Sequence, residues 1–321
     1  MKRIAFVFLA ALAWLGLGTA AVAQSDFPSR PVKIVVGYVP GASTDIAMRL
    51  VADKMSQGLG QTVIVDNKPG AAGLIAAQMV MRAPADGYTL LSFNPDLAGV
   101  VPALYKTPPY DPTKDFAYIG RLMRNSGWIM AVNPQLPVHT FDEFLKYAKA
   151  NKINYGSYGI GSLAHLHFEA LKLKTGIDMV HVPYKGGAQS YQAAMANEVQ
   201  AVIGTSFIEL LKSGKLRPLV IGGAIRSPQF PDVPSMAELG YGDQIFGEVY
   251  LGLAAPAGTP PAVIARISRE LERALALPEV QQRLGQFGDV AYAGPEEFTK
   301  IVQRDNALYG PLVRRLGLNT Q

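Results

Sequence analysis

A strand that ends in a loop of small residues and restarts as a helix is the feature that most constrains this chain. The apolar run at residues 34–36 predicts a buried strand, Pro40 and Gly41 end it, and a helix is expected from Ser43. Such a loop presents free backbone N–H groups and the positive end of a helix dipole to an anion. Residues 153–173 repeat the arrangement. Two such loops on separate α/β halves predict a cleft for a carboxylated small molecule.

The N-terminus has the pattern of a secretory signal peptide. Lys2 and Arg3 precede an apolar run at residues 4–17, and small residues follow up to Ala23. The run of 14 residues is shorter than the roughly 20 that span a bilayer. Cleavage is predicted after Ala23, before Gln24. Removing 23 of the 321 residues, with Lys2 and Arg3 among them, leaves 298 residues and lowers the formal net charge from +5 to +3.

Composition narrows the class of protein. The chain contains no cysteine, so an exported form depends on its apolar core rather than on disulfides, and it lacks a residue for lipid attachment. We therefore expect a freely diffusing periplasmic protein that is not membrane-anchored. Lys and Arg are spread along helices, as at residues 266–273, instead of being clustered, which argues against nucleic acid as a partner.

Strands alternate with helices along most of the chain, which predicts an α/β fold with parallel strands. Strands near residues 119–122 and 128–133 are expected to carry the chain from a first domain to a second, and a strand at 249–254 to bring it back. The first domain is therefore predicted to comprise residues 24–124 and about 247–321, and the second residues about 125–246. The final helix is expected to belong to the first domain, although it could pack on the second.

Motifs for catalysis or metal binding are incomplete. Residues 159–164 match the dinucleotide fingerprint G-x-G-x-x-A, but the preceding strand is very short and Asp178 comes before the next strand instead of ending it. Residues 41–45 lack the final glycine of a nucleophile elbow. The four histidines have no metal-ligand spacing. We therefore expect no metal, no cofactor and no enzymatic activity.

Ordered motifs along the whole mature chain carry a family resemblance. They are PGASTD at 40–45, NKPGAAG at 67–73, ADGYTLL at 85–91, YDPTKDF at 110–116, NYGS at 154–157, VHVPYKG at 180–186, SGKLR at 213–217, PDVP at 231–234 and APAGTP at 255–260. Together they resemble the Bug (Bordetella uptake gene), or TctC-like, family of solute-binding proteins of tripartite tricarboxylate transporters. The resemblance implies a two-lobe periplasmic binding protein, or Venus flytrap, with a mixed, mainly parallel sheet in each lobe.

The resemblance also implies a monomeric receptor that passes an organic acid to the permease subunits of a membrane transporter. Aromatic and dicarboxylic acids are both open as ligands, because Ala42 and Ser43 stand where the family loop usually carries glycine. Asp45 is interpreted as a residue that stiffens its loop, since a carboxylate facing an anionic ligand would repel it. The ligand-binding residues implied are Gly41, Ala42, Ser43, Thr44 and Asp45 in the first loop, Ser157, Gly159, Gly161, Ser162 and His165 in the second, and Phe93, Asn94, Tyr184, Lys185, Thr205 and Tyr250 as weaker candidates.

Two other functions stay open at this point. A secreted α/β hydrolase or lyase would use one of the loop serines, although the sequence identifies no base paired with either. A ligand-sensing subunit would share the receptor fold and dock on a membrane kinase instead of a permease.

Overall fold

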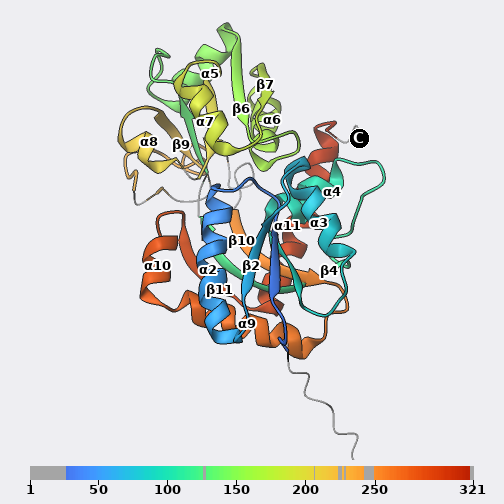
Figure 1. Ribbon diagram of the computed structural model, residues 1–321. Coiled ribbons are helices and arrows are strands. Elements are labelled where there is room, and N and C mark those ends of the chain that lie inside the picture. The colour runs from blue at the N-terminus through green and yellow to red at the C-terminus, as the bar shows by residue number, and fades with distance from the viewer. Residues whose placement is uncertain are drawn as a thin grey trace, which may run out of the picture.

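The computed structural model describes residues 27–125, 128–205, 207–222, 226–227, 229–241 and 249–318. In Figure 1 the chain forms two lobes, one above the other, each built on a sheet with helices around it. The predicted signal peptide, residues 1–23, and its cleavage site lie outside the described residues. Within these residues, no helix combines the length and the apolar character needed to cross a membrane.

The first lobe contains a six-stranded sheet with strands from both ends of the chain. β1 is parallel to β2 and β3, whereas β10 is antiparallel to β3 and β4, and β11 is antiparallel to β4. The order across the sheet is β11 (Asp289–Ala293), β4 (Phe116–Asn125), β10 (Val249–Pro256), β3 (Thr89–Phe93), β1 (Val32–Val36) and β2 (Val63–Asn67).

The second lobe contains a five-stranded sheet. β6 is parallel to β7 and β8, whereas β5 is antiparallel to β8 and β9. The order is β7 (Met179–Pro183), β6 (Ile153–Ser157), β8 (Ala201–Gly204), β5 (Ile129–Val132) and β9 (Arg217–Ile221). Both sheets are mixed, as predicted. Among the strands described, however, parallel pairings do not predominate, because the strands next to the crossings between lobes, β4, β5, β9 and β10, pair antiparallel.

Helices cover both faces of the first sheet because its inner strand β1 is apolar on both sides. Ile34 and Val36 pack with α2 (Ser43–Leu59), α9 (Pro261–Leu275) and α10 (Pro278–Leu284). Val35 faces the other way, into a cluster with α3 (Leu74–Met81) and the start of α11 (Pro295–Arg315). The short segments η1 (Ala71–Gly73), η2 (Asp96–Val100) and α4 (Val101–Ala103) lie on this second side.

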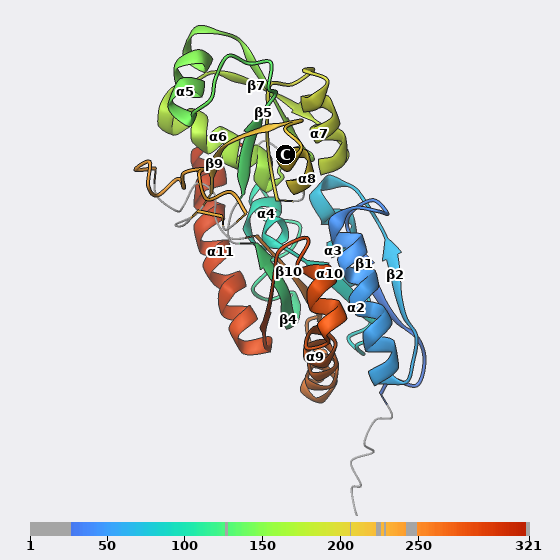
Figure 2. The same ribbon diagram turned by 90° about the vertical axis from the view of Figure 1, so that its left-hand side faces the viewer.

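The second lobe has the same layered plan, and α11 connects it to the first. Its helices are α5 (Phe141–Ala150), α6 (Leu163–Thr175), α7 (Gly187–Met195) and α8 (Ile208–Lys212). Figure 2 shows α11 running along the molecule from the lower lobe to the upper one. Phe298 and Val302 lie in a first-lobe cluster, whereas Tyr309 and Val313 lie in the core of the second lobe. A continuous helix therefore ties the two lobes together.

Two regions differ from the sequence prediction. β11 was not expected, since Asp289–Ala293 is a short edge strand with one buried residue and so has little period-two signal. In the second region, residues 93–115, the sequence favours a loop with one helical turn near 101–105. The structure places a π-helical turn, η2, directly before α4 there. Every residue from Asp96 to Ala103 is buried, so tertiary packing rather than local propensity holds this segment.

Candidate ligand-binding site between the lobes

A cavity lies between the lobes, where the loops after β1 and β3 face the second lobe. Seven of the residues predicted for the site line it: Ala42, Ser43, Thr44, Asn94, Lys185, Thr205 and Tyr250. Several lining residues were not predicted, among them Tyr38, Asp96, Arg124, Trp128, Tyr158 and Tyr191. The cavity thus combines the N-terminus of α2, two cationic side chains and an aromatic wall.

The N-terminus of α2 is open toward this cavity. Its N-cap residue, Ala42, is extended with φ −66° and ψ 155° and makes no side-chain capping hydrogen bond. Across the part of the chain that the structure describes, no hydrogen bond is recorded for the backbone N–H groups of Ser43 and Thr44. The first N–H groups of a helix have no partner within the helix, and the dipole adds a partial positive charge. This end of α2 is therefore suited to bind a carboxylate.

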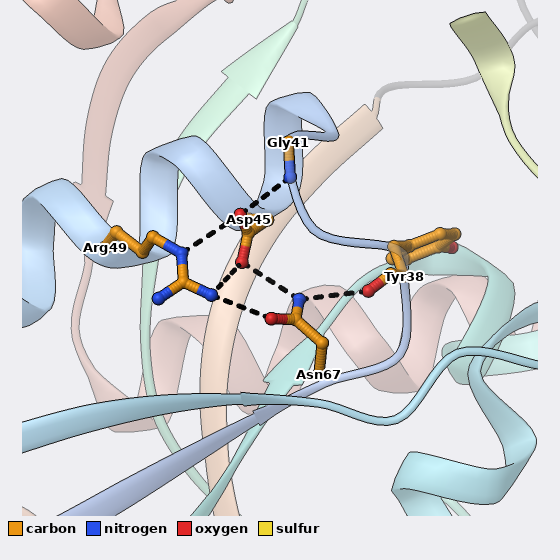
Figure 3. Close-up of polar contacts among 5 residues, drawn as sticks. All are labelled: Tyr38, Gly41, Asp45, Arg49 and Asn67. Atoms are coloured by element: carbon orange, nitrogen blue, oxygen red, sulfur yellow. Dashed lines mark hydrogen bonds and ion pairs between the residues drawn. The ribbon is translucent and has the colours of Figure 1, made fainter.

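Asp45 holds the first loop in shape, as the sequence predicted. Its carboxylate accepts hydrogen bonds of 2.9 Å from the Gly41 N–H, 3.0 Å from Arg49 Nε and 2.9 Å from Asn67 Nδ2 (Figure 3). The Asn67 amide also donates to the Tyr38 carbonyl at 3.0 Å. Burial acts to raise the pKa of Asp45, but the hydrogen bonds from Arg49, Gly41 and Asn67 outweigh it and lower the pKa. Asp45 does not line the cavity; it stiffens the loop that does.

This network is expected to stabilise the folded protein. Asp45→Asn removes the charge while keeping the side-chain size, so we expect the free energy of unfolding to fall by about 1–2 kcal/mol. Urea denaturation at pH 7.5 measures the change. Asp53→Asn is the matched control, because Asp53 lies on the same helix with its side chain exposed. Equal midpoints for the two variants would contradict the role given to Asp45.

The N-terminus of α6, in contrast, is already occupied. The Leu163 N–H donates to Asp96 Oδ1 at 2.6 Å, and the His165 N–H donates to Ser162 Oγ at 3.3 Å. The Ala164 N–H is hydrogen-bonded to the Tyr158 hydroxyl. Asp96 belongs to the first lobe and Leu163 to the second, so this contact crosses the interface between them.

The other predicted residues of the second loop bond within their own lobe. The Ser162 hydroxyl donates to the Gly159 carbonyl at 2.8 Å, and the Gly161 N–H donates to His165 Nδ1 at 3.2 Å. Ser157 Oγ lies 2.7 Å from His181 Nε2. Ser157, Gly159, Gly161, Ser162 and His165 do not line the cavity. Ser157 is 1% exposed, so its pairing with an imidazole is out of reach of a substrate.

Phe93, Tyr184 and Gly41 also lie outside this cavity. Phe93 is buried in an aromatic cluster with Phe116, Tyr118 and Phe298. Tyr184 and Gly159 instead line a neighbouring cleft, which Lys185 shares with the cavity. The rings of Tyr38 and Tyr158, packed edge to face at 6.4 Å, line both spaces and so stand between them.

Asp96 is the most unusual residue of the site. It is 2% exposed, and its Oδ2 accepts a hydrogen bond of 2.8 Å from the Tyr38 hydroxyl. Burial raises its pKa to about 6, against hydrogen bonds from Tyr38, the Leu163 N–H and Tyr158, which lower it. The available signal in the sequence was an acid three residues after a buried strand, in an otherwise mostly apolar stretch. That signal does not reveal the partner, which lies 67 residues away.

Trp128 was also missed as a wall of the cavity. Its indole stacks on Tyr158 with centroids 6.2 Å apart. The indole nitrogen is buried, and within the described residues it has no hydrogen-bond partner. Buried donors normally have a partner, so this N–H is a candidate donor to a bound molecule. No cluster of His, Asp and Glu that could hold a metal ion occurs among the described residues.

Comparison with known proteins connects this geometry to a family. The model of the tripartite tricarboxylate transporter family receptor, TctC, matches residues 47–318. The "UPF0065 protein in gbd 5'region" of Cupriavidus necator is 38% identical to this chain, over 99% of each.

Solved structures agree with that match. The periplasmic binding protein BugD superposes with a TM-score of 0.84 at 31% identity, covering 92% of this chain and all of BugD. R. palustris Rpa4515 with adipate gives 0.82 at 28% identity, over 91% and 98% of the two chains. MatC from Rhodopseudomonas palustris with bound malate gives 0.81 at 29% identity, over 89% and 100%.

Proposed function

The chain belongs to the TctC family of tripartite tricarboxylate transporter receptors, and on that premise we propose that its interlobe cavity captures a carboxylated small molecule for a membrane permease. The protein is a periplasmic solute-binding protein of the Bug type. The observation that carries the ligand class is the uncapped N-terminus of α2 at the cavity wall. A carboxylate there accepts from the N–H groups of Ser43 and Thr44 and lies at the positive end of the helix dipole.

The rest of the cavity supports an anionic guest. Lys185 and Arg124 both line it, and no ion pair or side-chain hydrogen bond is recorded for either within the described parts of the chain. Several charge-assisted hydrogen bonds are needed to offset the desolvation of a carboxylate, and these donors supply them. Two related structures contain adipate and malate, which are both carboxylic acids.

We infer the remaining steps from the family and the sequence, as parts of the same proposal. The signal peptide is removed after Ala23, and the mature protein diffuses in the periplasm as a monomer without a membrane anchor. There it closes on the acid, carries out no reaction and releases it to the permease subunits of the transporter.

A backbone substitution tests the site. Ser43→Pro removes one N–H at the first position of α2, where proline fits a helix, and the extended Ala42 suits a following proline. We expect the affinity for the acid to fall at least tenfold, the effect of one charge-assisted hydrogen bond, with the melting temperature of the free protein little changed. Affinity is measured by calorimetry with an acid first found in a thermal-shift panel on the mature protein.

Two serine variants are the controls. Ser43→Ala keeps the N–H and loses only the hydroxyl, so it is expected to weaken binding less than Ser43→Pro. Ser162→Ala alters a hydroxyl that is bonded to the Gly159 carbonyl and is expected to leave binding unchanged. Unaltered affinity in Ser43→Pro would rule out the N-terminus of α2 as the carboxylate site.

A further inference from the structure

We propose that Asp96 restricts this receptor to acids with a single carboxylate, because its own side chain occupies the anion-binding end of α6. The inference rests on the proposed function, since it concerns the ligand of the same cavity. It also sets this chain apart from the two related structures with adipate and malate, which are dicarboxylates.

The first argument is geometric. Two helix N-termini border the cavity, that of α2 through Ser43 and Thr44 and that of α6 through Leu163. A dicarboxylate that bridged these two ends would place one carboxylate at each. At α6 the Leu163 N–H is engaged at 2.6 Å by Asp96 Oδ1. A second guest carboxylate would have to displace Asp96 or lie against it.

Asp96 is held in that position by the first lobe. The Tyr38 hydroxyl donates to Asp96 Oδ2 at 2.8 Å, and Asn94 Nδ2 approaches the Tyr38 hydroxyl at 2.5 Å. Asn94 Oδ1 in turn accepts from the Leu97 N–H at 3.2 Å, which fixes the amide. Because each oxygen of the carboxylate has its own donors, Asp96 is a built part of the wall and not a mobile side chain.

The second argument is the charge of the cavity. Lys185 and Arg124 contribute two positive charges and Asp96 one negative charge. The sum is one net positive charge, which one guest carboxylate at the N-terminus of α2 balances. A second carboxylate would bring the cavity to a net negative charge with two carboxylates close together at α6, and like charges this close repel strongly where water is excluded.

The third argument is the character of the remaining wall. Trp128, Tyr191, Leu251 and Phe287 also line the cavity. These side chains favour an uncharged, apolar body on the guest, with the Trp128 N–H as a donor to a single neutral acceptor. The ligand class is thus a monocarboxylic acid with an aliphatic or aromatic body.

Matched pairs of acids test the inference on the mature protein. The straight-chain pairs, of four to eight carbons, each have the same number of carbons in the mono- and the dicarboxylate, as in hexanoate and adipate. Benzoate and terephthalate form an aromatic pair that differs by one added carboxylate. Affinities are measured by calorimetry at pH 7.5 for wild type, Asp96→Ala and Asp96→Asn. Asp53→Asn, an exposed acid on α2, controls for the loss of one negative charge.

For wild type, we consider the pair of acids that binds most tightly. In that pair the monocarboxylate is expected to bind at least tenfold more tightly than the dicarboxylate. In Asp96→Ala the freed Leu163 N–H is expected to raise dicarboxylate affinity at least tenfold more than monocarboxylate affinity. Asp96→Asn keeps an acceptor at Leu163 but loses the charge, so a smaller gain of at least threefold is expected. If Asp96→Ala does not fold, the ratio of monocarboxylate to dicarboxylate affinity in Asp96→Asn decides.

The outcomes separate the two claims. A wild type that prefers dicarboxylates, or mono-to-dicarboxylate ratios that stay the same in both Asp96 variants, would overturn the role of Asp96 and leave the proposed function standing. Absence of binding by every acid in the panel would overturn both.

Discussion

Gly161→Ala is expected to lower the free energy of unfolding by about 3 kcal/mol, from about 1–2 kcal/mol of backbone strain and a similar cost of overpacking. Gly161 has a φ of +77°, which L side chains rarely adopt. A methyl group there would overlap Cδ1 of Leu104 and lie 3.3 Å from its Cγ. Leu104 follows α4 in the first lobe and is 4% exposed, so it has little room to move.

The same substitution is expected to weaken ligand binding at least tenfold, because the added methyl group pushes the second-lobe loop away from the first lobe. Gly176→Ala is the matched control. Gly176 lies at the C-terminus of α6, the helix that Gly161 precedes; its φ is +71°, and nothing lies within 4 Å of an added methyl group. Gly176→Ala introduces the backbone strain without a contact like that with Leu104. It is expected to lower the free energy of unfolding by about 1 kcal/mol and to leave ligand binding unchanged. Urea denaturation and calorimetry measure both quantities. Equal losses in the two variants would show that the Leu104 contact contributes nothing.

Features encoded within a few residues were predictable from the sequence. The strand, loop and helix at residues 32–59 were expected because Pro40 and Gly41 interrupt an apolar run just before good helix formers. Thr140 and Glu143 have the spacing of a capping box, and the structure contains it in part: Thr140 Oγ1 accepts from the Glu143 N–H at 3.2 Å. The Glu143 carboxylate, however, accepts from the His139 N–H at 2.7 Å, one residue earlier than the motif predicts.

Contacts between the lobes could not be predicted in the same way. Both loops have the composition of an anion site, and only the structure distinguishes the open N-terminus of α2 from the occupied one of α6. The difference depends on Asp96, whose partner Leu163 begins α6 in the other lobe. Local sequence fixes which groups a loop presents, whereas the packing of two lobes decides which of those groups are still free. Of the residues that the family motifs marked, the first loop supplies Ala42, Ser43 and Thr44 to the cavity wall, and the second loop supplies none.

The second lobe should lose stability on mild acidification, and His167 is the clearest cause. His167 is 0% exposed, on α6, with the Trp128 ring edge to face at 5.1 Å. Burial lowers its pKa to about 3 from the 6.5 of an unperturbed imidazole. Below pH 6.5 the unfolded chain therefore binds a proton that the folded chain does not, so the free energy of unfolding falls as pH falls, down to about pH 3.

Between pH 7.5 and pH 5.0, His167 alone is expected to lower the free energy of unfolding by about 2 kcal/mol. The interval from pH 6.5 to pH 5.0 is about 1.5 pH units, and each unit contributes about 1.36 kcal/mol. Burial also lowers the pKa of His181, to about 3, and this adds a loss of the same sign. Asp96 acts in the opposite direction: its raised pKa, about 6, means that the folded chain binds a proton first as pH falls, which increases stability. The net change in wild type is a sum of these effects, so a variant is needed to isolate one of them.

His167→Phe provides that variant, because it keeps an aromatic ring in the core and cannot bind a proton. The difference in free energy of unfolding between pH 7.5 and pH 5.0, measured by urea denaturation, is expected to be about 2 kcal/mol smaller in His167→Phe than in wild type. His139→Phe is the control, since His139 is exposed and precedes α5, away from the core. Because both variants are compared with themselves at two pH values, any packing cost of the new ring cancels. A pH dependence in His167→Phe equal to that of wild type would mean that the buried imidazole takes up its proton as readily in the folded protein as in the unfolded chain.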